Sequence, residues 1–199
     1  IGCGDCNVCA KGDEHLCSSG PVIGLMQPGG FGDHVLVPDS KYLHDAGDTP
    51  EHLAGSYACS GLTAFSALKK GAPYISNNDL IIIGVGGVGM MGLQIAKAAF
   101  DCNPIVVDVD EDKLKLAIEN GASAAINPTD EDAMTKVFEI TGCNASVAID
   151  FVGSEQSTAF GINLLRKGGK YIIVGLYGGE LKLPLPLIPI TERGVQGSY

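Results

Sequence analysis

From residue 79 onward, short runs of apolar residues alternate with longer segments that mix apolar and polar residues. Short apolar runs predict buried strands, whereas the longer mixed segments predict helices with one buried face. Strands that are apolar on both faces are typical of a parallel sheet covered by helices on both sides. We therefore predict an α/β fold with a doubly wound parallel sheet. The predicted strands cover residues 80–84, 104–109, 124–127, 147–151 and 170–175, and the predicted helices cover residues 88–100, 111–120, 131–141 and 155–166.

The chain before residue 79 follows a different pattern. Residues 53–70 predict a helix whose apolar face contains Leu62, Phe65, Ala67 and Leu68. The segment Gly29–Val37 predicts a turn that leads into a short strand, which Pro38 would end. Near the other end of the chain, residues 183–189 contain three prolines and predict a connector or an edge segment, because proline cannot donate to a strand ladder.

Length and charge limit the classes of function that remain. A chain of 199 residues is long enough for one substantial core, or for one domain and part of another. A net charge of −10 argues against a nucleic-acid partner, and no apolar run approaches the roughly 20 residues that a membrane helix requires. The chain shows no signal peptide, so we expect a cytoplasmic protein. It also begins inside a cysteine motif, so we expect it to be a fragment of a longer protein.

Four cysteines lie within the first seventeen residues: Cys3, Cys6, Cys9 and Cys17. Two-residue gaps allow neighbouring thiolates to turn towards one centre, and four sulfurs suit tetrahedral Zn²⁺ with no open coordination position. Such a closed site stabilises a fold and does not activate a substrate. The alternative is a pair of disulfides, as in a small secreted scaffold. The seven cysteines of the chain are an odd number, so they cannot all pair with one another.

A glycine motif of the form G-x-G-x-x-G follows the first predicted strand and opens a helix, which is the context of a dinucleotide-binding loop. In that interpretation Gly84 permits the tight turn, Gly86 lets the backbone approach a pyrophosphate, and Gly89 lets helix and strand pack closely. The free N–H groups at the start of the helix would face the phosphates. The predicted cofactor-binding residues of this loop are Gly84, Gly86, Gly87, Val88 and Gly89.

Asp108 ends the second predicted strand, nineteen residues after Gly89. An acidic residue at about this offset accepts hydrogen bonds from the adenosine ribose of NAD, and its charge would repel the 2′-phosphate of NADP. We therefore predict Asp108 as a cofactor-binding residue and NAD as the cofactor. The alternative is that Asp108 only caps the following helix, a role that Asp110 could also fill.

The order of these segments resembles that of the zinc-dependent medium-chain alcohol dehydrogenases. The resemblance extends over essentially all 199 residues. The matching segments are the cysteine quartet, Gly-Gly-Phe-Gly-Asp-His-Val-Leu-Val-Pro from Gly29 to Pro38, Cys59-Ser-Gly-Leu-Thr63, the glycine loop with Asp108, and Val174-Gly175.

This resemblance implies two domains. Residues 1–55 would be the C-terminal part of a GroES-like β catalytic domain that carries a structural zinc lobe. Residues 56–199 would be a truncated NAD-binding Rossmann domain. In the family, the region that corresponds to residues 181–199 builds a strand edge that joins two cofactor domains, so the resemblance also implies a homo-oligomer, a dimer or a tetramer.

The resemblance also assigns roles to single residues. It places Cys59 on a catalytic zinc, Thr63 against the nicotinamide ring and Lys113 near the adenosine ribose. The backbone of Val174, Gly175 and Leu176 would hold the carboxamide. From the residues alone, Cys59 could equally be a small buried hydrophobic residue, and Lys113 a solvated helix lysine. Cys102 and Cys143 match no family motif and are predicted to be packing residues.

The function that the resemblance implies is reversible hydride transfer from a small alcohol to NAD, or back to the carbonyl compound, in an enzyme of class EC 1.1.1. In the family, two further ligands of the catalytic zinc lie upstream of the quartet, so we expect the 199-residue chain alone to be inactive. The alternatives are a polyol or amino-alcohol dehydrogenase on the same scaffold, and a zinc- and NAD-binding sensor module without catalysis.

Overall fold

The computed structural model describes residues 1–75 and 79–199; the polar residues Asn77 and Asn78, which precede the first predicted strand, lie outside the described residues. The chain divides into two compact units, residues 1–54, with which Tyr199 is grouped, and residues 55–198. The assignment of the first unit to a GroES-like domain stays a prediction. None of the helices among the described residues is both long and apolar enough to cross a membrane.

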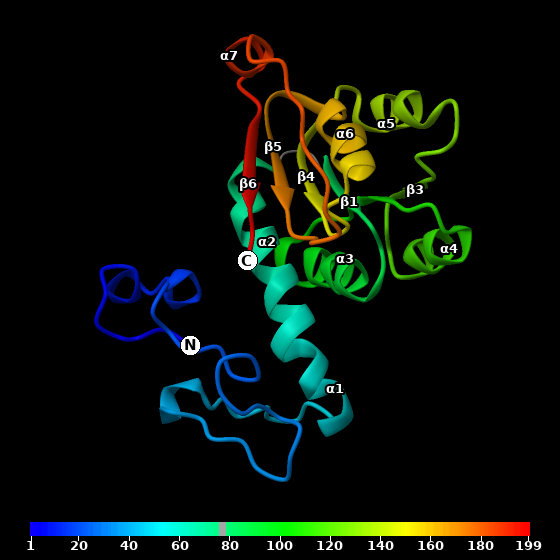
Figure 1. The fold of residues 1–199 in the computed structure, drawn as a ribbon. Helices are drawn as coiled ribbons and strands as arrows, with labels where there is room; N and C mark the ends of the chain where they lie inside the picture. The colour runs from blue at the N-terminus through cyan, green and yellow to red at the C-terminus, as the bar shows by residue number, and fades with distance from the viewer. Residues whose placement is uncertain (76–78) are drawn as a thin grey trace. The chain divides into compact units, whose positions relative to one another are not determined.

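The second unit is built around a six-stranded sheet in which every pair of neighbouring strands is parallel. The strand order is β3-β2-β1-β4-β5-β6. Figure 1 shows β6, β5, β4 and β1 following one another across the sheet. This order is the dinucleotide-binding arrangement, in which the connections reverse direction between β1 and β4. The predicted doubly wound parallel sheet is therefore confirmed. The strands are β1 (Leu80–Ile83), β2 (Ile105–Val107), β3 (Ala124–Ile126), β4 (Ala145–Asp150), β5 (Leu165–Ile173) and β6 (Gly194–Gly197).

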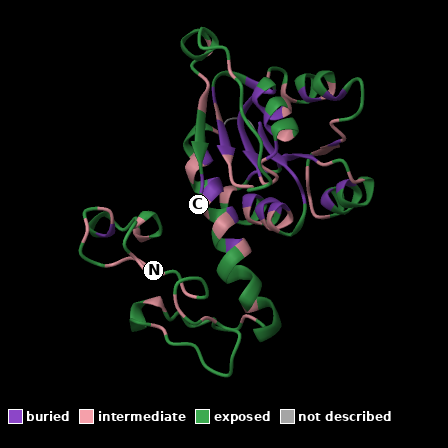
Figure 2. Ribbon diagram, in the orientation of Figure 1, coloured by how far each residue is buried: buried purple, intermediate pink, exposed green. Residues whose placement is uncertain are grey.

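Helices cover both faces of this sheet because successive strand residues point to opposite sides. Leu80 and Ile82 pack on one side with residues of α2, α3 and α4, whereas Ile81 and Ile83 pack on the other side with residues of α5 and α6. Figure 2 shows the central strands as the buried part of the unit. The helices are α1 (Glu51–Ser56), α2 (Leu62–Gly71), α3 (Gly87–Phe100), α4 (Glu111–Glu119), α5 (Ala133–Thr141), α6 (Glu155–Asn163) and α7 (Leu187–Thr191).

Two helix predictions in this unit were wrong in part. The helix predicted to end at residue 166 ends at Asn163, because the chain already joins the sheet there: the N–H of Ala145 donates to the carbonyl of Leu164 at 2.8 Å. In α2, Leu62 and Phe65 are exposed, and the buried face consists of Ala64, Ala67, Leu68 and Gly71. The helix approaches the sheet most closely at Gly71, where a Cβ would lie 2.9 Å from Cγ1 of Val147.

The first unit is short of regular structure. It contains 3-10 turns at Cys9–Lys11, Glu14–Leu16 and Ser40–Tyr42. The strand predicted within Gly29–Val37 does not form among the described residues. A strand requires a hydrogen-bonded neighbour, and no strand pairing is recorded for this segment in the described part of the chain. Phe31 and Leu36 are accordingly exposed.

Candidate functional site

The four cysteines of the first unit converge on one point. All four Sγ atoms lie within 4.8 Å of one another, and the contacts Cys6–Cys9, Cys3–Cys9 and Cys6–Cys17 measure 3.5, 3.9 and 3.9 Å. Four sulfurs at 2.3 Å from a tetrahedral Zn²⁺ would lie about 3.8 Å apart. All seven cysteines are free thiols, so the disulfide alternative does not hold. The quartet thus fits a closed zinc site.

The backbone of this lobe places thiols where they can ionise, as a metal ligand must. Backbone N–H groups, that of Cys3 first and that of Ser19 next, lower the pKa of the Cys17 thiol to about 6. The pKa of Cys9 behaves differently: the N–H of Gly4 lowers it, but burial and the neighbouring thiols outweigh that effect and raise it to about 11. Without a cation the four thiols would therefore not all be charged at neutral pH.

A second set of polar contacts ties the lobe to the segment that follows it. The Glu14 carboxylate accepts hydrogen bonds from Lys41 Nζ at 2.8 Å and from the Tyr42 hydroxyl. These two donors hold the pKa of Glu14 at about 2. The carboxylate therefore stays ionised, and the turn Ser40–Tyr42 is anchored to the turn that carries Glu14.

The glycine loop connects β1 to α3 with the geometry that its sequence predicts. Gly84 has φ +81°, and a Cβ there would lie 2.5 Å from Cγ2 of Val152. A Cβ at Gly89 would lie only 1.8 Å from the carbonyl oxygen of Gly84, so helix and strand approach too closely for any other residue. At Gly86, by contrast, a Cβ would meet no described atom within 4 Å. The loop is therefore tightly packed at Gly84 and Gly89 and open at Gly86.

The first turn of α3 begins at this opening. Gly86 is the N-cap residue and supplies no side chain, and no side chain of the described residues caps the first N–H groups of the helix. Free N–H groups and the positive end of the helix dipole together favour an anion. Gly86 and Gly87 are exposed, so the start of the helix is open to a ligand.

Asp108 lies beside the glycine loop, just after the end of β2. Its Oδ2 accepts a hydrogen bond from the N–H of Val85 at 2.8 Å, and its Oδ1 accepts one from the N–H of Asp110 at 3.1 Å. The alternative role as a helix cap belongs to Asp110, whose side chain accepts from the N–H groups of Asp112 and Lys113. Asp108 is half-buried and leaves its remaining lone pairs for a ligand.

The remaining predicted residues lie in exposed or intermediate positions. Lys113 Nζ lies 3.3 Å from Asp110 Oδ2 on the exposed side of α4, which agrees with a solvated helix lysine. Val174 and Gly175 lie just after β5, where their N–H groups donate to the carbonyl of Asp150 at 2.9 and 3.0 Å. Leu176 is exposed. A cavity of about 300 Å³ opens beside these residues, between Gly153, Gly175 and Gly178.

Cys59 lies in a π-helical turn, Tyr57–Gly61, that joins α1 to α2. Cys59 is exposed, so the alternative of a buried packing residue does not hold. Single π turns occur frequently at functional sites. Thr63 is half-buried at the start of α2. Among the described residues, the quartet is the one cluster of metal-ligand side chains with close ligand atoms, so a metal on Cys59 stays a prediction.

The two cysteines predicted to be packing residues have different environments. Cys102 is buried, and burial raises the pKa of its thiol to about 11. Cys143 is exposed, so its prediction was wrong. It directly follows Gly142, which ends α5 in the left-handed conformation, and the chain at this point has left the helix face that packs on the sheet.

One site residue escaped the sequence analysis. Asp150 ends β4 directly opposite Ile83 of β1 and is fully buried, yet its carboxylate accepts five hydrogen bonds. The signal that could have identified it is the same one that identified Asp108, an acidic residue at the end of an apolar strand. The segment Val147–Ile149 provides that context.

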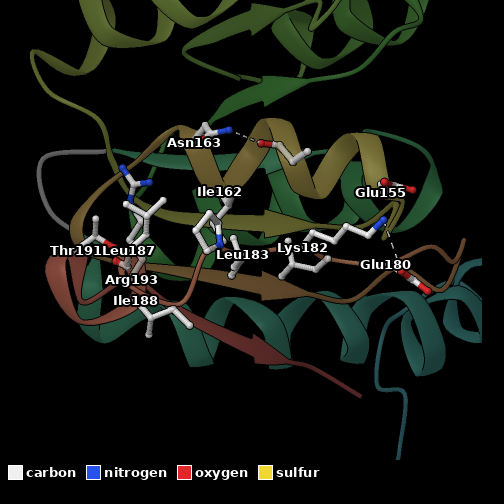
Figure 3. Close-up of a pocket in the computed structure, with 13 residues that line it drawn as sticks. Glu155, Ile162, Asn163, Glu180, Lys182, Leu183, Leu187, Ile188, Thr191 and Arg193 are labelled. Carbon is white, nitrogen blue, oxygen red and sulfur yellow. Dashed lines mark hydrogen bonds and ion pairs between the residues drawn. The ribbon is translucent and has the colours of Figure 1, made fainter.

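A separate cavity of about 240 Å³ lies between α6 and the segment that follows β5 (Figure 3). Ile162 and Leu183 contribute to its apolar wall, and Lys182 pairs with Glu180 at one end. In its wall Arg193 Nε is buried, with no hydrogen-bond partner among the described residues. None of the predicted site residues lines this cavity, although it shares Glu155, Glu180 and Leu181 with the 300 Å³ cavity.

Comparison with known proteins agrees with this arrangement. Residues 87–199 match the profile of the family described as zinc-binding dehydrogenase. An NAD-dependent alcohol dehydrogenase of Sulfurisphaera tokodaii is 38% identical over 197 residues, which are 98% of this chain and 56% of that protein. The chain thus spans about half the length of this curated relative.

Two solved structures share the fold over the whole chain. The alcohol dehydrogenase of Aeropyrum pernix is 32% identical with a TM-score of 0.87, and the match covers 100% of this chain and 58% of that one. The D-arabinose dehydrogenase of Sulfolobus solfataricus is 27% identical with a TM-score of 0.90, and the match covers 99% of this chain and 62% of that one.

Proposed function

Because this chain belongs to the zinc-binding dehydrogenase family, we propose that it is the zinc-lobe and NAD-binding part of an alcohol dehydrogenase. The observation that carries the proposal is the contact between Asp108 and the glycine loop. It places a carboxylate beside a helix start whose N–H groups are free, at the carboxyl edge of a parallel sheet. An acid for the ribose and N–H donors for the phosphates are the two requirements of a dinucleotide site.

In this proposal the cofactor lies along the carboxyl edge of the sheet. The N–H groups at Gly87 and Val88 bind the pyrophosphate, and Asp108 accepts hydrogen bonds from the adenosine ribose. Lys113 lies on the adenosine side, and the backbone of Val174–Leu176 binds the nicotinamide end. Asp108 excludes a 2′-phosphate by charge repulsion, so we propose NAD as the preferred cofactor.

The quartet Cys3, Cys6, Cys9 and Cys17 would hold a structural zinc. Four thiolates around one Zn²⁺ leave no position for a substrate, so this site acts on the stability of the lobe. Cys59 would be one ligand of a catalytic metal, whose chemistry is to bind the alcohol oxygen as a Lewis acid. Thr63 would line the nicotinamide pocket one helical turn after Cys59.

The activity that we propose for the complete protein is reversible oxidation of an alcohol to its carbonyl compound. The alcohol carbon gives a hydride to the nicotinamide, the hydroxyl proton leaves, and the reverse reaction consumes both. Residues of this chain bind and orient the cofactor. A cytoplasmic location stays a prediction for this protein.

NADH binding by the 199-residue chain tests the proposal directly. NADH is itself fluorescent, so a titration that follows its emission reports binding. We expect NADH to bind with saturation and NADPH to bind more weakly. Failure of both dinucleotides to bind at millimolar concentration would contradict the proposal, and tighter binding of NADPH would contradict the choice of cofactor.

A second candidate is a dehydrogenase that acts on polyols, sugars or amino-alcohols. Its support is the similarity to the D-arabinose dehydrogenase noted above. The cofactor site is the same in both candidates, so NADH binding does not separate them. Turnover assays of the complete protein separate them. The panel should contain primary alcohols, polyols, aldoses and amino-alcohols, and only one class should give a low KM. The sensor alternative predicts binding of NADH with turnover of none of them.

We also propose that the protein forms a homo-oligomer through the edge of its sheet. β6 pairs with β5 on one side only, and Val195 on it is exposed. The neighbouring residues Leu185, Ile188 and Ile190 are exposed as well. Free strand edges with apolar neighbours favour pairing with another chain. Light scattering coupled to size exclusion should give a multiple of the monomer mass, and a strict monomer would contradict this proposal.

A further inference from the structure

Asp150 lies where the two halves of the sheet meet. It is the last residue of β4, pairs in register with Ile83 of β1 and with Ile173 of β5, and is fully buried. Ligands of doubly wound sheets bind outside the carboxyl ends of the strands at this reversal between β1 and β4. A buried carboxylate directly beneath that point is costly unless it is fully hydrogen-bonded.

The two oxygens of Asp150 have different partners. Oδ1 accepts from the backbone N–H groups of Val152 and Gly153, at 2.8 and 3.0 Å. Oδ2 accepts from the hydroxyls of Ser157 and Tyr171, both at 2.8 Å, and more weakly from Thr158 at 3.4 Å. One oxygen thus fixes the turn after β4, and the other anchors the carboxylate to α6 and β5.

The turn that Asp150 holds touches both ends of the proposed cofactor site. On one side, Val152 lies so close to the glycine loop that a Cβ at Gly84 would clash with its side chain at 2.5 Å. On the other side, a Cβ at Gly175 would lie 2.1 Å from the backbone carbon of Val152. The turn therefore sets the spacing between the phosphate loop and the strand end after β5.

We propose that Asp150 is a positioning residue for the dinucleotide, because its carboxylate holds the turn at residues 151–153 between the glycine loop and Val174–Leu176. This inference rests on the proposed NAD-binding function and adds a specific role to it. Because Asp150 is fully buried, it is proposed to act through the turn and not through direct contact with the cofactor. It acts by keeping the pyrophosphate donors and the nicotinamide-side backbone at one fixed separation, which a ligand that spans both requires.

The chain offers a matched control in Asp79. Asp79 is also buried, and it also accepts hydrogen bonds from a serine, through the hydroxyl and the N–H of Ser146. It precedes β1, however, and therefore lies at the amino edge of the same sheet. Removal of either carboxylate disturbs a buried polar cluster, but only Asp150 lies at the edge where the cofactor is proposed to bind.

The test compares binding of NADH and of AMP, the adenosine half alone, by calorimetry on the 199-residue chain and its variants. In Asp150→Ala we expect the Kd for NADH to rise about tenfold, which corresponds to the loss of one hydrogen bond to a charged group. The Kd for AMP should change less than about twofold. In Asp79→Ala we expect both Kd values to remain at the unmodified level. A global loss of structure would instead weaken both ligands together.

The outcomes separate the two proposals. If the unmodified chain binds NADH and Asp150→Ala binds it equally well, or loses NADH and AMP in the same proportion, the positioning role is overturned and NAD binding stands. If the unmodified chain does not bind NADH, both proposals fail. Should Asp150→Ala not fold, Asp150→Asn decides: it keeps the shape of the side chain but loses the charge and one of the two acceptor oxygens. An NADH Kd that does not rise relative to the AMP Kd in this variant would overturn the role.

Discussion

The carboxylate of Asp108 accepts a hydrogen bond from the N–H of Val85 at 2.8 Å, across twenty-three positions of sequence. This bond joins the end of β2 to the loop that follows β1, and it fixes the acid next to the start of α3. Each of the two elements is ordinary alone. Their contact brings two separate sequence motifs together at one candidate site.

Replacement of Asp108 should change cofactor choice. In Asp108→Ala we expect NADH binding to weaken roughly tenfold, because a charged hydrogen-bond partner of the ribose is lost. The affinity for NADPH should change little, so the ratio of the NADPH Kd to the NADH Kd should fall. The matched variant is Asp110→Ala, which removes the cap of α4 and should lower stability by about 1 kcal/mol with an unchanged preference. The same preference in both variants would contradict the role of Asp108.

Substitution of two glycines of one loop should affect two different properties, stability at Gly89 and NADH binding at Gly86. Gly89→Ala places a Cβ 1.8 Å from the Gly84 carbonyl oxygen, so we expect a stability loss of about 1–3 kcal/mol from overpacking. Gly86→Ala meets no described atom, so its thermal midpoint should stay unchanged while NADH binding weakens. Thermal unfolding and NADH titration of both variants give the comparison. A Gly86→Ala variant that binds NADH normally would show that the pyrophosphate does not approach this residue.

Metal content should depend on the quartet and on no other cysteine of the chain. We expect about one zinc per chain, held by four sulfurs. Cys9→Ser should lose the metal and lower the thermal midpoint, whereas Cys143→Ser, which alters an exposed thiol, should change neither. Elemental analysis with thermal unfolding measures both properties. Full zinc content in Cys9→Ser would contradict the quartet site.

The Glu14 carboxyl of the first unit should become protonated at a lower pH than an ordinary glutamate carboxyl. Because Lys41 and Tyr42 hold the pKa of Glu14 at about 2, below the unfolded value of about 4.3, its contribution to stability is present above the unfolded pKa. That contribution is lost as the pH falls towards the folded pKa. At pH 4, NMR of the side-chain carboxyl should therefore still report an ionised Glu14. In Lys41→Met, which removes the largest cause of the lowered pKa, the same carboxyl should become protonated at a higher pH than in the unmodified chain. Protonation of the unmodified residue at pH 4 would contradict the contact.

Much of the second unit could be predicted from local patterns, because its strands are apolar runs that alternate with helices. The errors occur where distant parts of the chain decide. Residues 164–166 suit a helix by composition, but Leu165 pairs with Ala145 and is drawn into β5. Leu62 and Phe65 suit a buried face, but the face of α2 that packs on the sheet carries Ala64, Ala67, Leu68 and Gly71.

The sequence by itself determined the quartet, the glycine loop and the acid after β2, because each depends on residues that are close in the chain or on a fixed offset. It also determined the parallel sheet, since apolar strands that alternate with helices have few other ways to bury their surface. Only the tertiary structure revealed Asp150. Its importance comes from Val152, Ser157 and Tyr171 meeting one buried carboxylate, and a buried charge is stable only where the fold brings its hydrogen-bond partners together.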